Sequence, residues 1–284
     1  MKSSSLLAGI VLTVLAGIVF ASMDGLGKYL SGLLTVLQIV WGRYVFQTLI
    51  MTVLLASTTG TRFLKTRRPG LQLLRGATLL CATMLMYSAL ARAPLADVTA
   101  TLFVSPILVT VFSVIFLGER IGVHRIGAVV LGFVGVLLIV RPGSDAMQPH
   151  LLLALAAAVC NAGYLLLTRR LAGADDTAST QFNTTAVGAV LLSVAIIPFW
   201  ETPSAFVFAL MTLSGAMGTL GHYILVRAFA NAPASLLSPF LYGQVLFAGI
   251  FSVALFGDPL HPAMVAGTLI LVLSGLYIWW RENR

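Results

Sequence analysis

The chain has 284 residues, of which 59% are hydrophobic and only 9% are charged, and its mean hydropathy is +1.00. Soluble domains are about 45–50% apolar and about 25% charged, so a water-soluble globule cannot hide this much apolar surface, and disorder is excluded for the same reason. The net charge of +8 does not indicate nucleic-acid binding, because 17 Lys and Arg residues in so apolar a chain first mark membrane topology.

Apolar runs separated by charge, glycine or proline predict an all-α polytopic membrane protein with ten transmembrane helices. The first run follows Lys2 as in a signal peptide, but it is long and no cleavage boundary closes it, so we interpret it as a retained helix. The stretch 95–140 is the hardest to divide, because only 118–122 separate its two runs. The predicted helices span residues 6–30, 35–56, 72–92, 95–116, 122–140, 151–170, 178–200, 205–230, 234–256 and 262–281.

Lys and Arg are distributed unevenly over the predicted connections. With the N-terminus inside, 13 of them fall on inner segments and 3 on outer ones, Lys28, Arg92 and Arg141, while Arg43 falls within the second helix. The positive-inside rule therefore predicts that both termini are cytoplasmic, and we expect a bacterial inner membrane. The longest connection, 57–71, holds four basic residues and either anchors this topology or contacts anionic lipid headgroups.

The two halves of the chain resemble each other in sequence. Residues 91–96 match 230–235, and residues 116–119 match 255–258, both at an offset of 139. At an offset of 140, Gly127 matches Gly267, Gly135 matches Gly275 and Arg141 matches Arg281.

These matches predict two repeats of five helices, which we place at 1–141 and 150–284. Because five is odd, the second repeat enters the membrane from the opposite side. Inverted repeats are typical of secondary transporters, since exchanging the conformations of the two halves turns an outward-open state into an inward-open one. Pro94 and Pro233 are placed to begin helices after tight turns. The glycines of each half, eight residues apart, share a helix face and favour close packing.

Several short motifs of the first half, together with counterparts in the second half, carry a family resemblance. They are Gly42-Arg43-Tyr44, Ala91–Ala96, Ser105-Pro106, Phe116–Glu119, Pro233, Pro239 and Phe256–Asp258. Together they resemble the drug/metabolite transporter superfamily, of the ten-helix EamA type, over essentially the whole chain. The resemblance implies paired five-helix repeats around a central cavity. Within the superfamily the chain looks most like YddG-like exporters of amino acids, including aromatic ones.

Signatures of soluble enzymes are absent from the sequence. It contains no GxxxxGK[ST], GxGxxG, HExxH or GxSxG motif, and Cys81 and Cys160 each lie within an apolar run, which excludes a disulfide framework or a CxxC site. We therefore expect no catalytic residues, no cofactor and no metal site. A channel-like pore and an intramembrane enzyme stay open as alternatives of other classes.

Charged residues within the predicted spans are the first functional candidates, because a charge at the centre of a spanning helix costs about 2.5–3.5 kcal/mol. Asp24 and Lys28 are four residues apart and share one helix face. They form either a local ion pair or part of a gate or of a site for a zwitterion. Arg43 is expected to pair with Asp24 across helices.

A second group of polar and aromatic residues falls near the middle of the predicted membrane. Its members are Met84, Tyr87, Thr101, Ser105, Asn161, Tyr164, His222, Tyr223, Tyr242 and Gln244. By the repeat offset, Phe103 corresponds to Tyr242, Ser105 to Gln244 and Met84 to Tyr223. Corresponding positions of this kind are what a cavity on a pseudo-two-fold axis requires. His222 is also the deep residue suited to carry a proton near neutral pH.

The sequence thus predicts a secondary transporter of small metabolites that works by alternating access and exports neutral or aromatic amino acids. The alternative within the same superfamily is a carrier of drugs or of other metabolites. The expected partners are the small-molecule substrate and membrane lipid, without nucleic acid, and the expected oligomeric state is a monomer.

Overall fold

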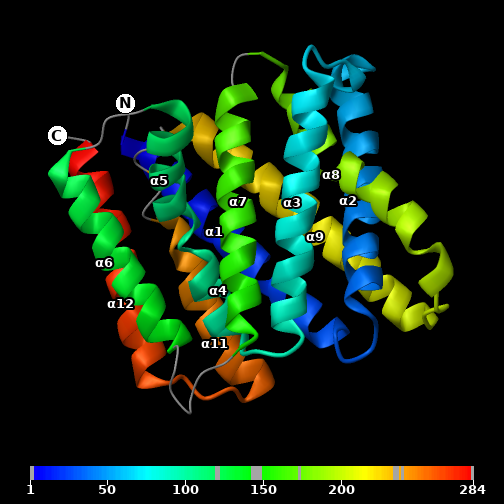
Figure 1. Ribbon diagram of the computed structural model, residues 1–284. Helices are drawn as coiled ribbons and strands as arrows, with labels where there is room; N and C mark the ends of the chain where they lie inside the picture. Colours follow the sequence, from blue (N-terminus) through cyan, green and yellow to red (C-terminus); the bar gives the residue numbers. More distant parts are fainter. Residues whose placement is uncertain are drawn as a thin grey trace.

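The structure, a computed structural model, describes residues 3–118, 122–141, 149–171, 174–232, 237 and 240–282. Within these residues the regular secondary structure is entirely helical (Figure 1). The first half contains α1 (Ser3–Leu30), α2 (Val36–Thr59), η1 (Arg62–Leu64), α3 (Pro69–Leu90), α4 (Leu95–Leu102), α5 (Ser105–Leu117) and α6 (Val123–Val140). The second half contains α7 (Leu151–Leu171), α8 (Thr177–Ala195), η2 (Ile197–Phe199), α9 (Ala205–Asn231), α11 (Gly243–Phe256) and α12 (Pro262–Glu282).

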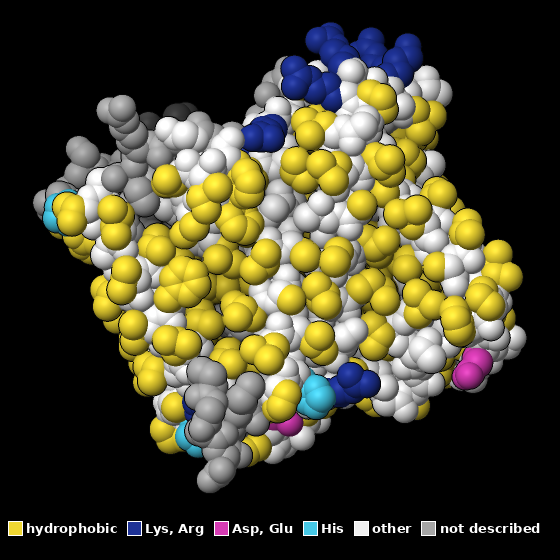
Figure 2. All heavy atoms as spheres, viewed as in Figure 1, with side chains coloured by type: hydrophobic (Ala, Val, Ile, Leu, Met, Phe, Trp, Pro, Cys, Tyr) yellow, Lys and Arg dark blue, Asp and Glu magenta, His cyan; other side chains and the backbone are white. Residues whose placement is uncertain are grey.

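The face of the bundle seen in Figure 2 is apolar over its middle. Six described spans are long and apolar enough to cross a membrane, with α4 and α5 forming one of them, and α6, α11 and α12 contain shorter apolar stretches. Val53, Leu131 and Leu273 are among the large apolar side chains that are exposed. Lipid is the solvent that such a surface requires, so the prediction of a polytopic all-α membrane protein is confirmed.

Capping residues set several helix ends. Thr35, Asp176 and Ser204 precede α2, α8 and α9, and each accepts a hydrogen bond from a backbone N–H of the first turn. At the other end, α5 and α11 stop at Gly118 and Gly257, both of which have φ 66°. This left-handed conformation favours glycine, and the two glycines hold corresponding places in the two repeats.

Three predicted helices are interrupted in the structure, among them the one predicted over 234–256, in which a turn at Tyr242 precedes α11. The helix predicted over 95–116 divides into α4 and α5, because Pro106 in the first turn of α5 has no N–H to continue the ladder. The helix predicted over 178–200 ends at Ala195 and continues as the short η2, which contains Pro198. Glu119, Pro233 and Pro239, and most of the predicted junction between the repeats, lie outside the described residues.

Helix packing follows the two inverted five-helix repeats. Helix α1 packs against α9 and α11, and its counterpart α7 packs against α3 and α5. Similarly, α2 packs against α9 as α8 packs against α3. Exchanging the halves therefore converts each pair into the other. The corresponding helices α6 and α12 lie side by side at one edge of the bundle (Figure 1).

The predicted glycine contacts are confirmed in three of four cases. Gly135 and Gly267 face each other between α6 and α12, where a Cβ on either would overlap the backbone carbonyl oxygen of the other. Gly275 is covered by the Tyr242 side chain. The prediction is wrong for Gly127, because a Cβ there would meet nothing within 4 Å.

Another glycine, Gly132 of α6, receives a side chain from α5. The Ile107 side chain is 1% exposed, and its Cδ1 occupies the space that a Cβ on Gly132 would need. A substituent at Gly132 must therefore displace Ile107 from the core.

We expect Gly132→Val to destabilise the protein by roughly 1–3 kcal/mol through overpacking. Gly127→Val is the matched control, since it places the same side chain on the same helix but in open space. Thermal unfolding in detergent should give a clearly lower midpoint for Gly132→Val than for the control. Equal midpoints would contradict this packing.

The basic α2–α3 connection is fastened to the second half by Asp175. This carboxylate accepts hydrogen bonds from the Thr66 hydroxyl, the Arg67 N–H and the Gln72 amide. Partial burial works to raise the pKa of Asp175, but these hydrogen bonds and the Arg67 charge outweigh it and hold the pKa below its ordinary value. The connection is thus a structural link between the halves at the end where Lys and Arg gather (Figure 2).

We expect Asp175→Asn to lower the unfolding midpoint at pH 7. Because the folded-state pKa of Asp175 is depressed, its contribution is present above the unfolded pKa of about 3.9 and disappears as the pH falls through the folded-state value. The midpoints of the wild type and the variant, measured from pH 7 to pH 3, should therefore converge in acid. A difference independent of pH would show that the charge of Asp175 is not involved.

Candidate functional site

Two opposite charges lie enclosed in the bundle. Asp24 of α1 is only 2% exposed, and its Oδ2 accepts a hydrogen bond of 3.1 Å from Nε2 of Gln244 on α11. Arg43 of α2 is surrounded by protein but keeps part of its side chain accessible. The positive charge of Arg43 acts on Asp24, although no ion pair within 4.0 Å joins them among the described contacts.

An aromatic neighbour holds the guanidinium of Arg43. Its Nη1 donates to the Tyr87 hydroxyl of α3 at 3.3 Å, and its Cζ lies 5.5 Å from the centroid of that ring. Its Nε is buried without a hydrogen-bond partner. The guanidinium thus keeps donor capacity that the described side chains do not use.

His222 of α9 completes this group. Its ring lies edge-on to Phe20 of α1 with centroids 5.2 Å apart, and the charge of Arg43 acts on it. We call Asp24, Arg43, Tyr87, His222 and Gln244 the central cluster. Five helices from both repeats supply it, and all five residues are among those predicted from the sequence.

The ion pair expected between Arg43 and Asp24 is wrong, and so is one of the two alternatives for Asp24 and Lys28, the local ion pair. Lys28 pairs with Asp258 instead of Asp24, because the last turn of α1 lies against the end of α11. Arg43 donates to the Tyr87 hydroxyl instead of pairing with Asp24, whose Oδ2 is held by Gln244. The four-residue spacing places Asp24 and Lys28 on one helix face, but it does not predict that Lys28 pairs with Asp258.

Tyr164 belongs to a separate cluster around Arg75, one of the 13 basic residues counted above on inner segments. Arg75 of α3 is 3% exposed, and its Nη2 donates to the Tyr164 hydroxyl at 2.9 Å. Its other donors reach the Thr168 hydroxyl and the Thr180 carbonyl oxygen. Because Arg75 falls inside the helix predicted over 72–92, its position within a span was the available signal.

The remaining predicted residues are dispersed. The hydroxyls of Thr101 and Ser105 donate to backbone carbonyls, that of Ser105 also to Ala158 of α7, so both residues serve the fold. Tyr223 is 53% exposed and lies beside Arg227, outside the central cluster. Met84 and Asn161 are half-buried on α3 and α7.

Tyr242 meets its own counterpart in the other repeat. The ring centroids of Phe103 and Tyr242 lie 5.5 Å apart with an interplanar angle of 44°. Residues related by the repeat offset can touch only where the pseudo-two-fold axis passes between them. The axis therefore runs close to this aromatic pair.

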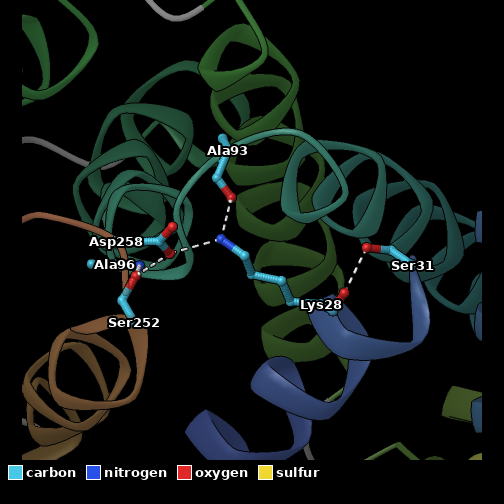
Figure 3. A network of polar contacts seen from close by, with 6 residues as sticks. All are labelled: Lys28, Ser31, Ala93, Ala96, Ser252 and Asp258. Atoms are coloured by element: carbon cyan, nitrogen blue, oxygen red, sulfur yellow. Dashed lines mark hydrogen bonds and ion pairs between the residues drawn. The ribbon is translucent and has the colours of Figure 1, made fainter. Parts of the chain in front are cut away.

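The pair formed by Lys28 and Asp258 joins the two halves (Figure 3). The end of α1, which carries Lys28, lies at the end of the bundle opposite the α2–α3 connection (Figure 1). Nζ of Lys28 lies 2.8 Å from Oδ2 of Asp258 and donates to the Ala93 carbonyl oxygen at 3.1 Å. The Ser252 hydroxyl donates to the same Oδ2 at 2.8 Å and accepts from the Ala96 N–H at 3.3 Å. We call these five residues the latch.

The latch is partly open to solvent. The Lys28 and Asp258 side chains are 16% and 21% exposed, and they lie beside a cavity of about 430 Å³. That cavity is lined by Lys28, Tyr29, Ser31, Gly32, Leu33, Leu90, Ala91 and Phe256. Lys28 thus both lines this cavity and forms the ion pair with Asp258.

We expect Lys28→Gln and Asp258→Asn each to destabilise the protein, and the double variant to lose little more than either single variant. The missing additivity should correspond to a coupling energy of about 1 kcal/mol, as for a well-placed pair near the surface. Unfolding midpoints of the four proteins measure it, with Arg92→Gln, an exposed cation at the same end, as control. Full additivity would mean that the pair does not hold the halves together.

Comparison with known proteins adds the family context to this geometry. The model of the EamA-like transporter family matches residues 7–141 and again residues 148–280. An S-adenosylmethionine uptake transporter of Rickettsia bellii is 26% identical over 92% of this chain and 89% of its own. A riboflavin transporter of Brucella anthropi is 29% identical over 89% and 90%, and a pseudopaline exporter of Pseudomonas aeruginosa is 28% identical over 94% of each chain.

A crystal structure of a protein that is 20% identical matches all of both chains with a TM-score of 0.65. At this level of identity the likeness supports the fold alone.

Proposed function

The chain belongs to the EamA-like transporter family, and from that premise we propose that it moves small zwitterionic metabolites, first of all neutral and aromatic amino acids, by alternating access. That it is a membrane transporter rather than an enzyme follows from the family and from the named relatives. The class of solute is our proposal, and the central cluster is the observation that carries it.

The central cluster offers one group to each end of a zwitterion. Arg43, with its unpartnered buried Nε, suits a carboxylate, because guanidinium–carboxylate hydrogen bonds are charge-assisted. Asp24, held by Gln244, suits an ammonium group. Two enclosed charges that do not satisfy each other are costly in a membrane, and a bound zwitterion would compensate both at once.

Aromatic rings beside these charges favour a solute with an apolar or aromatic body. Tyr87 lies under the guanidinium of Arg43, and Phe20 and His222 lie edge to face nearby. The relatives' named solutes differ widely, but S-adenosylmethionine does carry an α-amino acid group. The α-amino acid group that S-adenosylmethionine shares with free amino acids supports the proposed solute class. Because the relatives' solutes differ, experiment must identify the rest of the transported molecule.

The latch suits the role of a gate at one end of the pathway. It joins α1 of the first repeat to the end of α11 in the second, so the movement of one half against the other must break it. With both termini in the cytoplasm, as the positive-inside rule predicts, the latch lies on the outer side. We propose export as the direction, following the resemblance to amino-acid exporters.

Counterflow in proteoliposomes tests this function. Vesicles preloaded with one unlabelled solute receive a trace of labelled tyrosine or leucine outside, and a transient overshoot is expected for a carrier. Overshoot with S-adenosylmethionine but with no amino acid would restrict the solute class to larger conjugates. A labelled solute that equilibrates without saturation or overshoot would indicate a pore.

We expect Arg43→Gln to abolish discrimination between tyrosine and its decarboxylated analogue tyramine. Losing one charge-assisted hydrogen bond of about 1.5–3 kcal/mol should weaken competition by tyrosine roughly 10- to 100-fold, while competition by tyramine changes little. Tyr223→Phe, an exposed position outside the cluster, should leave both values unchanged. If Arg43→Gln weakens both competitors equally, Arg43 does not bind the carboxylate.

A further inference from the structure

A long apolar groove separates α11 from α12 in the second repeat. Its volume is about 710 Å³. The lining residues are Tyr242, Gly243, Val245, Leu246, Gly249, Ile250, Val253, Ala254, Leu260, Met264, Val265, Thr268, Leu269 and Val272. Apart from the hydroxyls of Tyr242 and Thr268, these side chains are apolar, so water gains nothing by filling the groove.

The groove exists because one contact of the first repeat has no equivalent in the second. Between α5 and α6, Ile107 fills the space over Gly132 and is 1% exposed. The corresponding residues of the second repeat are Leu246 and Val272. The isopropyl group of Val272 blocks the space that glycine leaves open, and Leu246 is accordingly 64% exposed.

Packing elsewhere keeps the two walls apart. Helix α12 packs against α6 through the close approach of Gly267 and Gly135, while α11 packs against α1 and α4. Each wall is thus held by a different neighbour, although only the short segment 257–261 connects them. The groove cannot close without breaking one of these contacts.

The groove also has the length of one bilayer leaflet. Along α11 it extends from Tyr242 to Ala254, which at 1.5 Å per residue is about 18 Å. Half of a hydrocarbon core of about 30 Å is about 15 Å. Its outer end lies at Leu260 in the α11–α12 connection, and its inner end at Tyr242 and Val272. It therefore runs from the membrane surface to the middle of the bilayer.

We propose that this groove binds one acyl chain of a bilayer phospholipid, taken from the leaflet at the α11–α12 connection. Both walls are apolar helices of a membrane protein, so the bilayer is the phase from which the groove is filled. The apolar lining and the length of the groove match one acyl chain. Its headgroup would lie at the membrane surface near Leu260, and the chain would extend along the groove to the middle of the bilayer. This proposal does not depend on which solute the protein transports.

The bound chain would brace the start of α11. That turn carries Tyr242, which lines the groove and contacts Phe103, and Gln244, which donates to Asp24 in the central cluster. The two side chains leave opposite faces of the same helical turn. An acyl chain against Tyr242 therefore supports the position from which Gln244 holds Asp24.

The first experiment compares two glycine-to-leucine variants. Gly249 lines the groove, and a Cβ there meets nothing within 4 Å, so Gly249→Leu fills the groove without an internal clash. Gly127→Leu adds the same side chain to open space on α6. After extensive detergent washing, native mass spectrometry should detect one retained phospholipid on the wild type and on Gly127→Leu. Gly249→Leu should retain at least tenfold less.

A second measurement needs no variant. Wild-type protein in nanodiscs that contain a phospholipid with a diazirine at the middle of one acyl chain is irradiated, and the adducts are mapped by peptide mass spectrometry. Adducts should concentrate on α11 and α12 residues of the groove, relative to other lipid-facing helices.

Three results would overturn the proposal. The first is equal phospholipid retention by folded Gly249→Leu and the control. The second is labelling spread evenly over the lipid-facing surface. The third is a second copy of this chain seated on the groove, which would appear as a dimer in the native spectrum, with cross-links between α11 and α12 of two copies and no retained lipid.

Discussion

The interior of a bilayer offers no hydrogen-bonding partner, and this constraint governs the rest of the structure. Backbone groups must be satisfied within helices, so the described regular structure is helical. The same constraint makes every interior charge a problem that the chain must solve locally. Lys28 is neutralised by Asp258, and Arg75 is surrounded by hydroxyl and carbonyl oxygens. Among the described contacts, Asp24 accepts a hydrogen bond from Gln244 without an ion pair, and Nε of Arg43 is buried without a partner, which is why we propose these two residues as the solute site.

Internal symmetry explains where these charges meet. Equivalent helices pack in exchanged pairs, and equivalent aromatic residues touch at Phe103 and Tyr242. At particular positions the two repeats carry different residues, and these differences change the local packing. Val272 replaces the glycine that lets Ile107 pack in the first repeat, and the apolar groove lies between the last two helices of the second repeat. The central cluster likewise draws unlike residues, Tyr87 and His222, from the corresponding helices α3 and α9.

Much of this architecture could be predicted from the sequence, because apolar run length and repeat offsets act along the chain. Partners across helices could not. Asp24 and Lys28 share a face by spacing, yet Lys28 lies against Asp258, 230 residues further on. Tyr223 is polar and deep in its predicted span, but the helix turns it outward. Arg75 lies within the helix predicted over 72–92, but it was counted among the basic residues that set membrane orientation. The rotation of a helix about its axis decides such cases, and in a uniformly apolar helix the sequence pattern does not reveal it.

The contact between Phe103 and Tyr242 also bears on how such a chain could arise. In an antiparallel dimer of a single five-helix ancestor, these two positions would be one residue that meets its own copy across the axis. A substitution there would act twice, and no hydroxyl could be added to one side alone. Fusion of two gene copies removes that restriction. A phenylalanine can then face a tyrosine, so the two sides of the axis differ in chemistry, which the identical subunits of a homodimer do not allow.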